Sequence, residues 1–310
     1  MSLARHLSRT LRDRQGFIVV AALWILAALA ALASIYSIYV ANAAISISVN
    51  DESLQAEAMV KASLELTAFH LLNEKEKDRP TRGQFAFRMG KASANVDFCS
   101  EAARVDLNMA SKDLLAGLFT ALGASADQAE QYADRVIGWR TAPSAGSADK
   151  EGSLYRAAGL GYGPRGGPFA HIGELALVLD LPPAMVERAM PYVTVYSGRA
   201  QVNVLDADPA VVAALPGMTP TRLAAFLKER TAIAPHSALT DLGTAQNMVT
   251  TEGSKATRVS VRVRFDDGRQ IASEVVILLA GSEEPYRVLS WQDDADGPMA
   301  ANAGQGAVRR

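Results

Sequence analysis

The chain has 310 residues, of which 49% are hydrophobic and 21% are charged, close to ordinary globular usage and long enough for about two domains. Its formal net charge of −2 gives no reason to expect a nucleic-acid partner, and its single cysteine, Cys99, excludes an intramolecular disulfide. We expect the Cys99 thiol to be buried and inert. The four histidines are too scattered to indicate a metal cluster.

The N-terminus carries an apolar segment from 17 to 40, and no charged residue occurs between Arg14 and Asp51. The segment exceeds the roughly 20 residues that a membrane-spanning helix needs. Four arginines precede it, against a single acid, Asp13. Because positive residues stay on the cytoplasmic side, we expect a cytoplasmic N-terminus and a chain that lies outside the cytoplasm beyond about Val40.

Three interpretations of this segment are open. A cleaved secretory signal peptide has an apolar region of roughly 7–15 residues and small residues before its cut, which Ala41-Asn42-Ala43 would imitate. A plain membrane anchor needs nothing beyond the apolar run. A prepilin-type leader, 1–16, is cut on the cytoplasmic side, and Gly16 lies directly between the basic residues and the apolar run that Phe17 begins.

The residues after this junction favour the third interpretation. No glycine follows Gly16 before Gly83, and no proline occurs before Pro80. One helix is therefore predicted from about Phe17 to Arg79, roughly 95 Å long at a rise of about 1.5 Å per residue, with 17–40 in the membrane and 41–79 outside it. Beyond the membrane, an apolar stripe recurs at helical spacing and is predicted to pack on a globular domain: Leu54, Ala58, Ala62, Leu66 and Phe69.

Two β-hairpins are predicted on either side of the middle of the chain. Residues 83–99 alternate around Gly90, and residues 257–280 alternate around a turn at Asp266-Asp267-Gly268. Residues 285–291 add a third strand. Segments 80–100 and 251–291 are therefore predicted to form one antiparallel sheet, followed by a polar, glycine-rich tail at 292–310 that we expect to be disordered.

The middle of the chain, 101–250, is predicted to be an inserted all-α domain that repeats itself. The stretch VDLNMASKDLLAGL at Val105 matches VNVLDADPAVVAAL at Val202 at a constant offset of 97 residues. Ser111 and Asp208 are the predicted helix N-caps. We expect two related modules, at about 105–200 and 202–250.

These modules resemble helix-hairpin-helix and SAM-like folds, some of which bind DNA. Such hairpins hold a phosphate on backbone N–H groups, usually with a Gly-x-Gly turn and nearby Lys or Arg. Here the turn has Gly217 but lacks the second glycine, and 97–250 carries 16 acids against 12 Lys plus Arg, a net of −4. This balance opposes phosphate contact, so a membrane-tethered DNA-binding protein is the alternative and nucleic acid is not the expected partner.

An extra loop, 144–168, separates the halves of the first module. Its stretch GLGYGPRGG lacks the preceding strand and the Gly-Lys-Ser/Thr ending of a phosphate loop. Asp149 and Glu151 are candidate calcium ligands, although calcium takes roughly 6–8 oxygens. No arrangement of a nucleophile with a base is present in the pattern, so we do not expect an enzyme and name no catalytic residue.

The junction Gly16-Phe17, followed by a long apolar helix, resembles the type IV pilin and pseudopilin families. The resemblance implies that a prepilin peptidase cuts after Gly16 and methylates the new N-terminal Phe17. The fifth mature residue is usually glutamate, which pairs with the N-terminal amine of the subunit assembled before it; here it is Ala21. Because an unpaired carboxylate in a bilayer is costly, Ala21 indicates a subunit with nothing above it, at the tip of a filament.

The order of parts makes the resemblance more specific. An α+β chain with a pilin-like helix, a β-hairpin, a large helical insertion and a closing hairpin is similar to the minor pseudopilin K family of the type II secretion system. The stretches that carry the match run from Arg14 to Trp291: RQGFIVVAALWILAAL, ARVDLNMAS, YRAAGLGYGPRGGPFAHIGELALVLDL, YVTVYSG, VNVLDADPAVVAALPGM and YRVLSW.

This family resemblance implies a tip subunit of a periplasmic pseudopilus, held in the bacterial inner membrane by one helix with its globular part in the periplasm. It implies partners of the minor pseudopilin I and J types, and contacts with the secretin or with exported proteins. It also implies calcium in the inserted domain, although Thr141-Ala142-Pro143 stands where acids are expected. A minor pilin of a type IV pilus is a further alternative.

Overall fold

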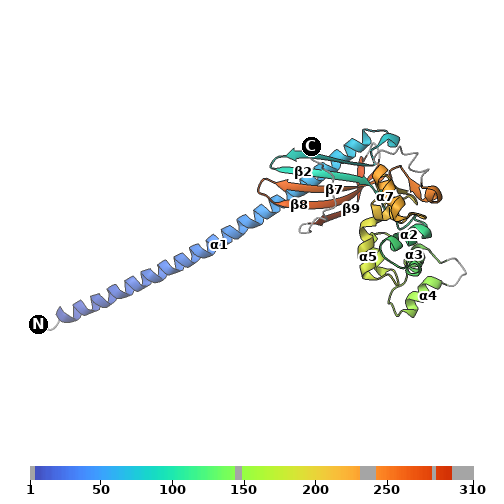
Figure 1. The fold of residues 1–310 in the computed structure, drawn as a ribbon. Helices are drawn as coiled ribbons and strands as arrows, with labels where there is room; N and C mark the ends of the chain where they lie inside the picture. Colours follow the sequence, from blue (N-terminus) through green and yellow to red (C-terminus); the bar gives the residue numbers. More distant parts are fainter. Residues whose placement is uncertain (1–3, 144–148, 231–241, 281–283, 295–310) are drawn as a thin grey trace. The chain divides into compact units, whose positions relative to one another are not determined.

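The computed structural model describes residues 4–143, 149–230, 242–280 and 284–294. The chain divides into two compact units, Met1–Ala58 and Met59–Arg310, each described here by itself. The first unit is helical, and the second combines an antiparallel sheet with short helices (Figure 1). The fold is therefore mixed helix and antiparallel sheet, as predicted.

Helix α1, Ala4–Leu72, makes up the described part of the first unit and continues into the second. Its stretch Phe17–Val40 is long and apolar enough to cross a membrane, and none of it is buried. The helix ends earlier than predicted, because the chain turns at Asn73 and passes through the short 3-10 turn η1, Glu76–Asp78. Arg79 is extended, as expected for a residue before proline.

The face that α1 buries in the second unit differs from the predicted stripe. The prediction was wrong: Phe69 is 65% exposed, Ala62 and Leu66 are only half-buried, and in the first unit Leu54 is 56% exposed. Ser63 and Thr67 are buried because their hydroxyls donate to the carbonyls of Met59 (2.8 Å) and Ser63 (2.7 Å) within the helix. The buried face consists of Met59, Val60, Ser63, Leu64, Thr67, Ala68 and Leu71.

Five strands form one antiparallel sheet in the order β1-β2-β7-β8-β9. They are β1 (Arg82–Met89), β2 (Ala92–Ser100), β7 (Ala256–Phe265), β8 (Gln270–Leu279) and β9 (Tyr286–Asp294). Both predicted hairpins are present, and their turns use Gly90 (φ 59°) and Gly268 (φ 91°), where a left-handed backbone favours glycine. Strand β9 includes residues 292–294, which were predicted to be disordered; 295–310 lie outside the described residues.

The two faces of the sheet differ as the alternation of β7 predicts. Val259, Val261 and Val263 are at most 1% exposed, whereas Arg262 and Arg264 on the opposite face are exposed. The side chains of successive strand residues point to opposite faces. The valine face therefore builds the core of the sheet.

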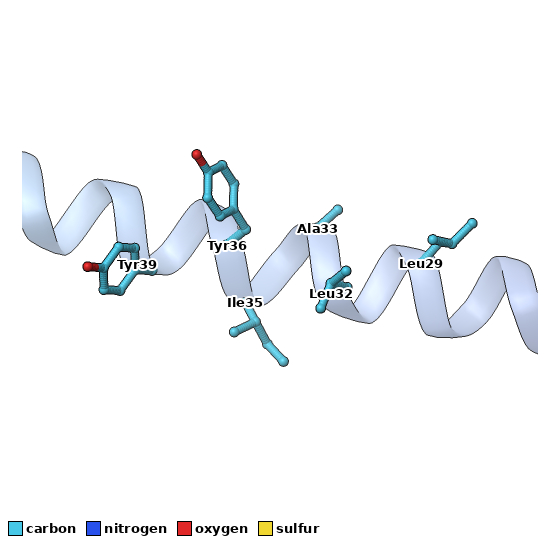
Figure 2. A pocket seen from close by; sticks show the side chains of 6 residues that line it. All are labelled: Leu29, Leu32, Ala33, Ile35, Tyr36 and Tyr39. Atoms are coloured by element: carbon cyan, nitrogen blue, oxygen red, sulfur yellow. The ribbon is translucent and has the colours of Figure 1, made fainter.

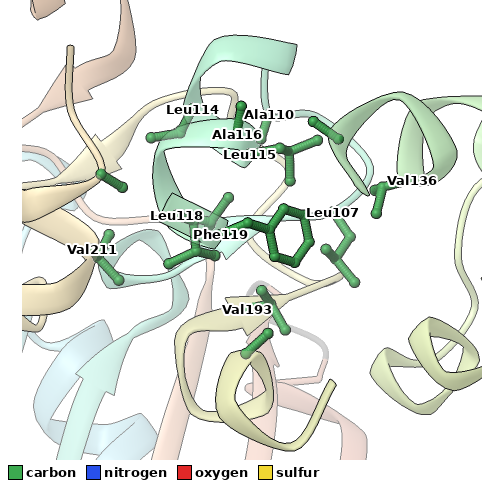
Figure 3. Close-up of a cluster of buried hydrophobic side chains, with 14 of the residues drawn as sticks. Leu107, Ala110, Leu114, Leu115, Ala116, Leu118, Phe119, Val136, Val193 and Val211 are labelled. Atoms are coloured by element: carbon green, nitrogen blue, oxygen red, sulfur yellow. The ribbon is translucent and has the colours of Figure 1, made fainter. Parts of the chain in front are cut away.

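The inserted segment between β2 and β7 packs around one apolar core, with α2 in contact with both α3 and α6 (Figure 3). Its helices are α2 (Lys112–Ala121), α3 (Ala126–Arg140), α4 (Lys150–Ala157), η3 (Ile172–Leu177), α5 (Pro183–Ala189), η4 (Met190–Tyr192), α6 (Pro209–Ala213), α7 (Pro220–Glu229) and η5 (Gly243–Met248). Residues 144–148 and 231–241 lie outside the described residues.

The inserted segment is not purely helical, which corrects the all-α prediction. A short parallel pair joins β3, Val105–Asp106, to β4, Val193–Thr194. A second joins β5, Val202–Asn203, to β6, Val249–Thr250. Each pair is only two residues long, too short for strand periodicity to reveal in the sequence.

Hydrogen bonds repeat between the two halves of the inserted segment at the offset found in the sequence. Leu107 N donates to Thr194 O (2.8 Å), and Val204 N donates to Thr250 O (3.2 Å), where 204 − 107 = 97. The Ser111 and Asp208 side chains cap α2 and α6 as predicted. The repeat is therefore structural as well as sequential.

Candidate functional site

The apolar part of α1 is the first candidate site, because its side chains have no partner within the described chain. Leu29, Leu32, Ala33, Ile35, Tyr36 and Tyr39 line a shallow apolar hollow along the helix (Figure 2). The hydroxyl of Ser34 donates to Ala30 O (2.9 Å), so this polar group is satisfied inside the helix. A surface of this kind fits lipid or other apolar helices, because these surroundings contain no water and the Ser34 hydroxyl needs none.

The predicted processing residues lie on this helix. Both Gly16 and Phe17 fall within α1, and the Phe17 side chain is 76% exposed. Ala21 brings no charge to the apolar segment. Cleavage between Gly16 and Phe17 stays a prediction.

The outer face of α1 in the second unit carries a further hollow, in which apolar and polar side chains are mixed. Glu65, Phe69, Leu72, Asn73 and Pro285 line a hollow there. The Tyr286 hydroxyl donates to Glu65 Oε1 (3.1 Å), and burial together with this carboxylate raises the pKa of Tyr286 to about 12. The exposed Phe69 side chain therefore lies in the same hollow as Glu65, which the hydrogen bond from Tyr286 holds in place.

A buried carboxylate, Glu101, joins the sheet to the inserted segment. It lies in the 3-10 turn η2, Glu101–Ala103, directly after β2, and is fully buried. Arg258 of β7 donates to it from Nε (2.7 Å) and Nη2 (3.2 Å), and Arg104 donates from Nη1 (3.4 Å). The Thr194 hydroxyl, at the end of the first module, also donates to Glu101.

The charges at this junction are balanced by the same contacts. Burial alone would raise the pKa of Glu101, but the hydrogen bonds and charge of Arg258 outweigh it and hold the pKa below its usual range. Arg258 also pairs with Glu274 of β8, and Arg104 Nε donates to Pro191 O (3.1 Å). The network therefore ties β7, β8 and both ends of the first module together.

The two candidate calcium ligands are engaged in other contacts. Asp149 caps α4 by accepting from Gly152 N (2.8 Å) and lies 3.6 Å from Arg156. Glu151 accepts both its hydrogen bonds from Arg135 Nη1 (3.0 and 2.8 Å). Among the described residues no group of three or more Asp, Glu, His or Cys side chains gathers to hold a metal. These donors do not fit a calcium site as they stand, so calcium binding stays a prediction.

The arginines that DNA binding would require are used inside the modules. Arg140 Nη2 donates to Ala110 O (2.7 Å), and Arg230 Nη1 donates to the equivalent Ala207 O (2.7 Å). Arg222 Nη1 donates to Gly217 O (3.0 Å), in the turn that would hold a phosphate. These contacts give the arginines structural roles and do not favour the DNA-binding alternative.

Sequence reasoning missed the Glu101 network. Arg258 belongs to the arginines that alternate with valines along β7, and this alternation predicts that the arginines face solvent. Its partner lies 157 residues away, and no local pattern marks the pair.

The long helix with an apolar first half, the five-stranded antiparallel sheet and the inserted segment together give an architecture of the pilin-like type. Residues 95–198 match the model of a family described as type II secretion system (T2SS), protein K. A chain in the crystal structure of the GspK-GspI-GspJ complex from the enterotoxigenic Escherichia coli type 2 secretion system has a similar fold. The TM-score is 0.58 at 18% identity, and the similarity covers 81% of this chain and 99% of that chain.

The comparison with curated proteins found no match. The family match covers 104 of the 310 residues (198 − 95 + 1), and the structural likeness, at its low identity, concerns the fold. Together they confirm the resemblance to the protein K family of minor pseudopilins that the sequence indicates.

Proposed function

We propose that the chain is the tip subunit of a periplasmic pseudopilus, which primes assembly together with minor pseudopilins of the I and J types and supports export across the outer membrane. The observation that carries this proposal is the uncovered apolar surface of α1, attached to a pilin-like sheet. A helix that is apolar all round and unburied needs lipid or other helices around it.

Assembly follows from the physics of that helix. Within the bilayer, lipid tails are as apolar as leucine, so water exclusion does not favour helix association. Packing does, and small side chains let helices approach closely. Five of the seven residues from Ala27 to Ala33 are alanine, which supports this stretch as a contact with neighbouring helices.

Ala21 supports the place at the tip. A subunit within the shaft uses a carboxylate at this position to pair with the N-terminus of the subunit above. A carboxylate without that partner would be costly in the apolar surroundings of the helix. A subunit with nothing above it is therefore more stable with alanine.

Processing by a prepilin peptidase completes the proposal. Removal of residues 1–16 deletes four arginines and one aspartate, so the formal charge becomes (31 − 4) − (33 − 1) = −5. The mature N-terminus would be methylated Phe17 at the cytoplasmic side of a single inner-membrane helix. The bulk of the inserted segment then lies in the periplasm, where the secretin or exported proteins would be within reach.

Co-purification tests the proposal. The full chain is co-expressed with I-type and J-type pseudopilins from the same organism and is extracted in mild detergent. The proposal predicts a ternary complex that Phe69→Glu weakens, because this substitution places a charge on the uncovered face of α1. Leu154→Glu, at an exposed leucine (41%) of the inserted segment, is the matched control and should leave the complex intact. Recovery of the chain without either pseudopilin would refute the proposal.

A further inference from the structure

Strand β1 is a regular edge strand with a free backbone edge. It pairs with β2 over eight residues, from Arg82↔Cys99 to Met89↔Ala92, without a register shift. Within the described part of the chain, β2 is the one strand to which β1 is hydrogen-bonded. Its other edge therefore presents N–H and C=O groups that no described strand pairs with, and such groups are a template for a further strand.

A contiguous row of rings borders this edge. The centroid of Phe85 lies 5.2 Å from that of His70 and 6.4 Å from that of Phe87, and His70 lies 6.1 Å from Phe69. Phe85 and Phe87 point to the face of the sheet that α1 covers, yet both stay only half-buried because they lie at its margin. We call Phe69, His70, Phe85 and Phe87 the edge ring row. Exposed apolar patches next to a free strand edge are typical of interaction surfaces.

The opposite edge of the sheet is protected against added strands. Pairing of β9 with β8 shifts register between Val276 and Ile277. Pro285 stands directly before β9, and Asp293 on it accepts from Ser273 Oγ (2.6 Å) and Trp291 Nε1 (2.7 Å). Bulges, prolines and charges are the devices by which edge strands avoid pairing. The contrast singles out β1 as the edge that is open to a partner.

The charges on β1 disfavour a second copy of the chain as that partner. Arg82 and Arg88 lie on the same face of the strand, six residues apart (88 − 82), because side chains alternate with period two. In an antiparallel pair of two β1 strands, Arg82 of one copy would face Arg88 of the other at both ends. In a parallel pair each arginine would lie beside its own copy. Like charges across a strand pair are destabilising, so a partner with acids at these positions fits better.

We propose that β1 accepts an extended segment of a partner pseudopilin as a sixth strand. The segment carries acidic side chains opposite Arg82 and Arg88, about six residues apart, and apolar side chains on the alternate positions that pack on the edge ring row. Arg88 already pairs with the exposed Asp266 (2.9 Å), and the partner acid shares this guanidinium. The partner's class rests on the proposed function.

Photo-crosslinking in membranes tests this surface. p-Benzoylphenylalanine replaces Ala86, which is exposed on β1, in the full chain co-expressed with the I-type and J-type pseudopilins. Ser290 on β9 is the matched control position. We expect a crosslink from position 86 to one pseudopilin, mapped by mass spectrometry to an extended segment with two acids, and none from position 290. Arg82→Glu in the same chain should lower the crosslink yield about fivefold, whereas Arg264→Glu, on the same face but an inner strand, should not.

Three results would overturn the inference. A crosslink of position 86 to a second copy, or to an exported protein, would assign the edge to another partner. Equal yields with Arg82→Glu and Arg264→Glu would remove the charge argument. If no crosslink forms at position 86 while the ternary complex still co-purifies, the proposal that β1 binds a partner strand is refuted and the proposed function is not. If co-purification itself fails, the proposed function is refuted.

Discussion

Replacing Glu101 by glutamine is predicted to destabilise the second unit strongly. The substitution keeps the size of the side chain but removes the charge that Arg258 and Arg104 share. Glu101 is fully buried and the Arg258 side chain is only 12% exposed, so water cannot replace the lost carboxylate. Arg258 retains Glu274, whose side chain is 39% exposed and therefore a weaker partner.

The expected magnitude follows from these contacts. Four hydrogen bonds reach the two carboxylate oxygens, three of them from guanidinium groups. Breaking a buried pair by removing one partner costs about 3–5 kcal/mol, because the remaining charge stays buried. We expect Glu101→Gln to lower the free energy of unfolding by about that amount at pH 7. Thr194 also loses a charged acceptor, so the contact between β4 and the sheet should loosen with it.

Urea unfolding of the detergent-solubilised full chain, followed by tryptophan fluorescence and far-UV circular dichroism, measures the effect. Glu252→Gln is the matched control, since Glu252 pairs with Arg199 near the same junction but its side chain is 74% exposed. An exposed pair contributes about 0–1 kcal/mol. A loss of less than about 1 kcal/mol for Glu101→Gln, similar to the control, would refute the claim that this network holds the junction together.

Three further predictions concern titration, the thiol and calcium. The lowered pKa of Glu101 contributes stability that is fully present above the ordinary carboxyl pKa and is lost as pH falls through the lowered value. Asp106, whose pKa burial raises, has the opposite effect on stability, so the test compares wild type with Glu101→Gln at each pH. The difference in stability between the two proteins should shrink as pH falls from 7 to about 3. A constant difference in urea midpoint across that range would contradict this sign. Cys99 is half-buried rather than buried as predicted, yet burial around its thiol raises the pKa of Cys99 to about 11. Iodoacetamide at pH 8 should therefore label the folded chain more slowly than the urea-unfolded chain, and equal rates would show an accessible thiol. Glu151→Gln should lower the unfolding midpoint even without calcium, because Glu151 pairs with Arg135. The calcium site expected from the family resemblance is tested in the same assay: a calcium-dependent rise in the midpoint that Glu151→Gln abolishes would establish it, and an unchanged midpoint would exclude Glu151 as a ligand.

Much of the sheet was predictable because its pattern is local. Alternating valines in β7, with Gly268 at the following turn, determine both the strand and the face that it buries. The N-caps Ser111 and Asp208 were predictable for the same reason, since a cap depends on the residues next to it.

The features that escaped prediction depend on contacts far apart in the sequence or on how polar groups are satisfied. The prediction that α1 buries a stripe of five apolar residues assumed that serine and threonine on this helix are exposed. The five residues are Leu54, Ala58, Ala62, Leu66 and Phe69. Ser63 and Thr67 are buried instead, because their hydroxyls bond to the helix itself. Glu101 escaped because its partner lies on a strand that follows the whole inserted segment.

The central proposal is that this chain is processed as a pseudopilin, and the mass of its membrane-extracted form tests that proposal most directly. The full chain is expressed with and without a prepilin peptidase and measured intact. The account predicts a peptidase-dependent loss of residues 1–16, with one methyl group added at Phe17, and no loss in Gly16→Ala. An uncut chain in the presence of the peptidase, or a cut near Ala43, would contradict it.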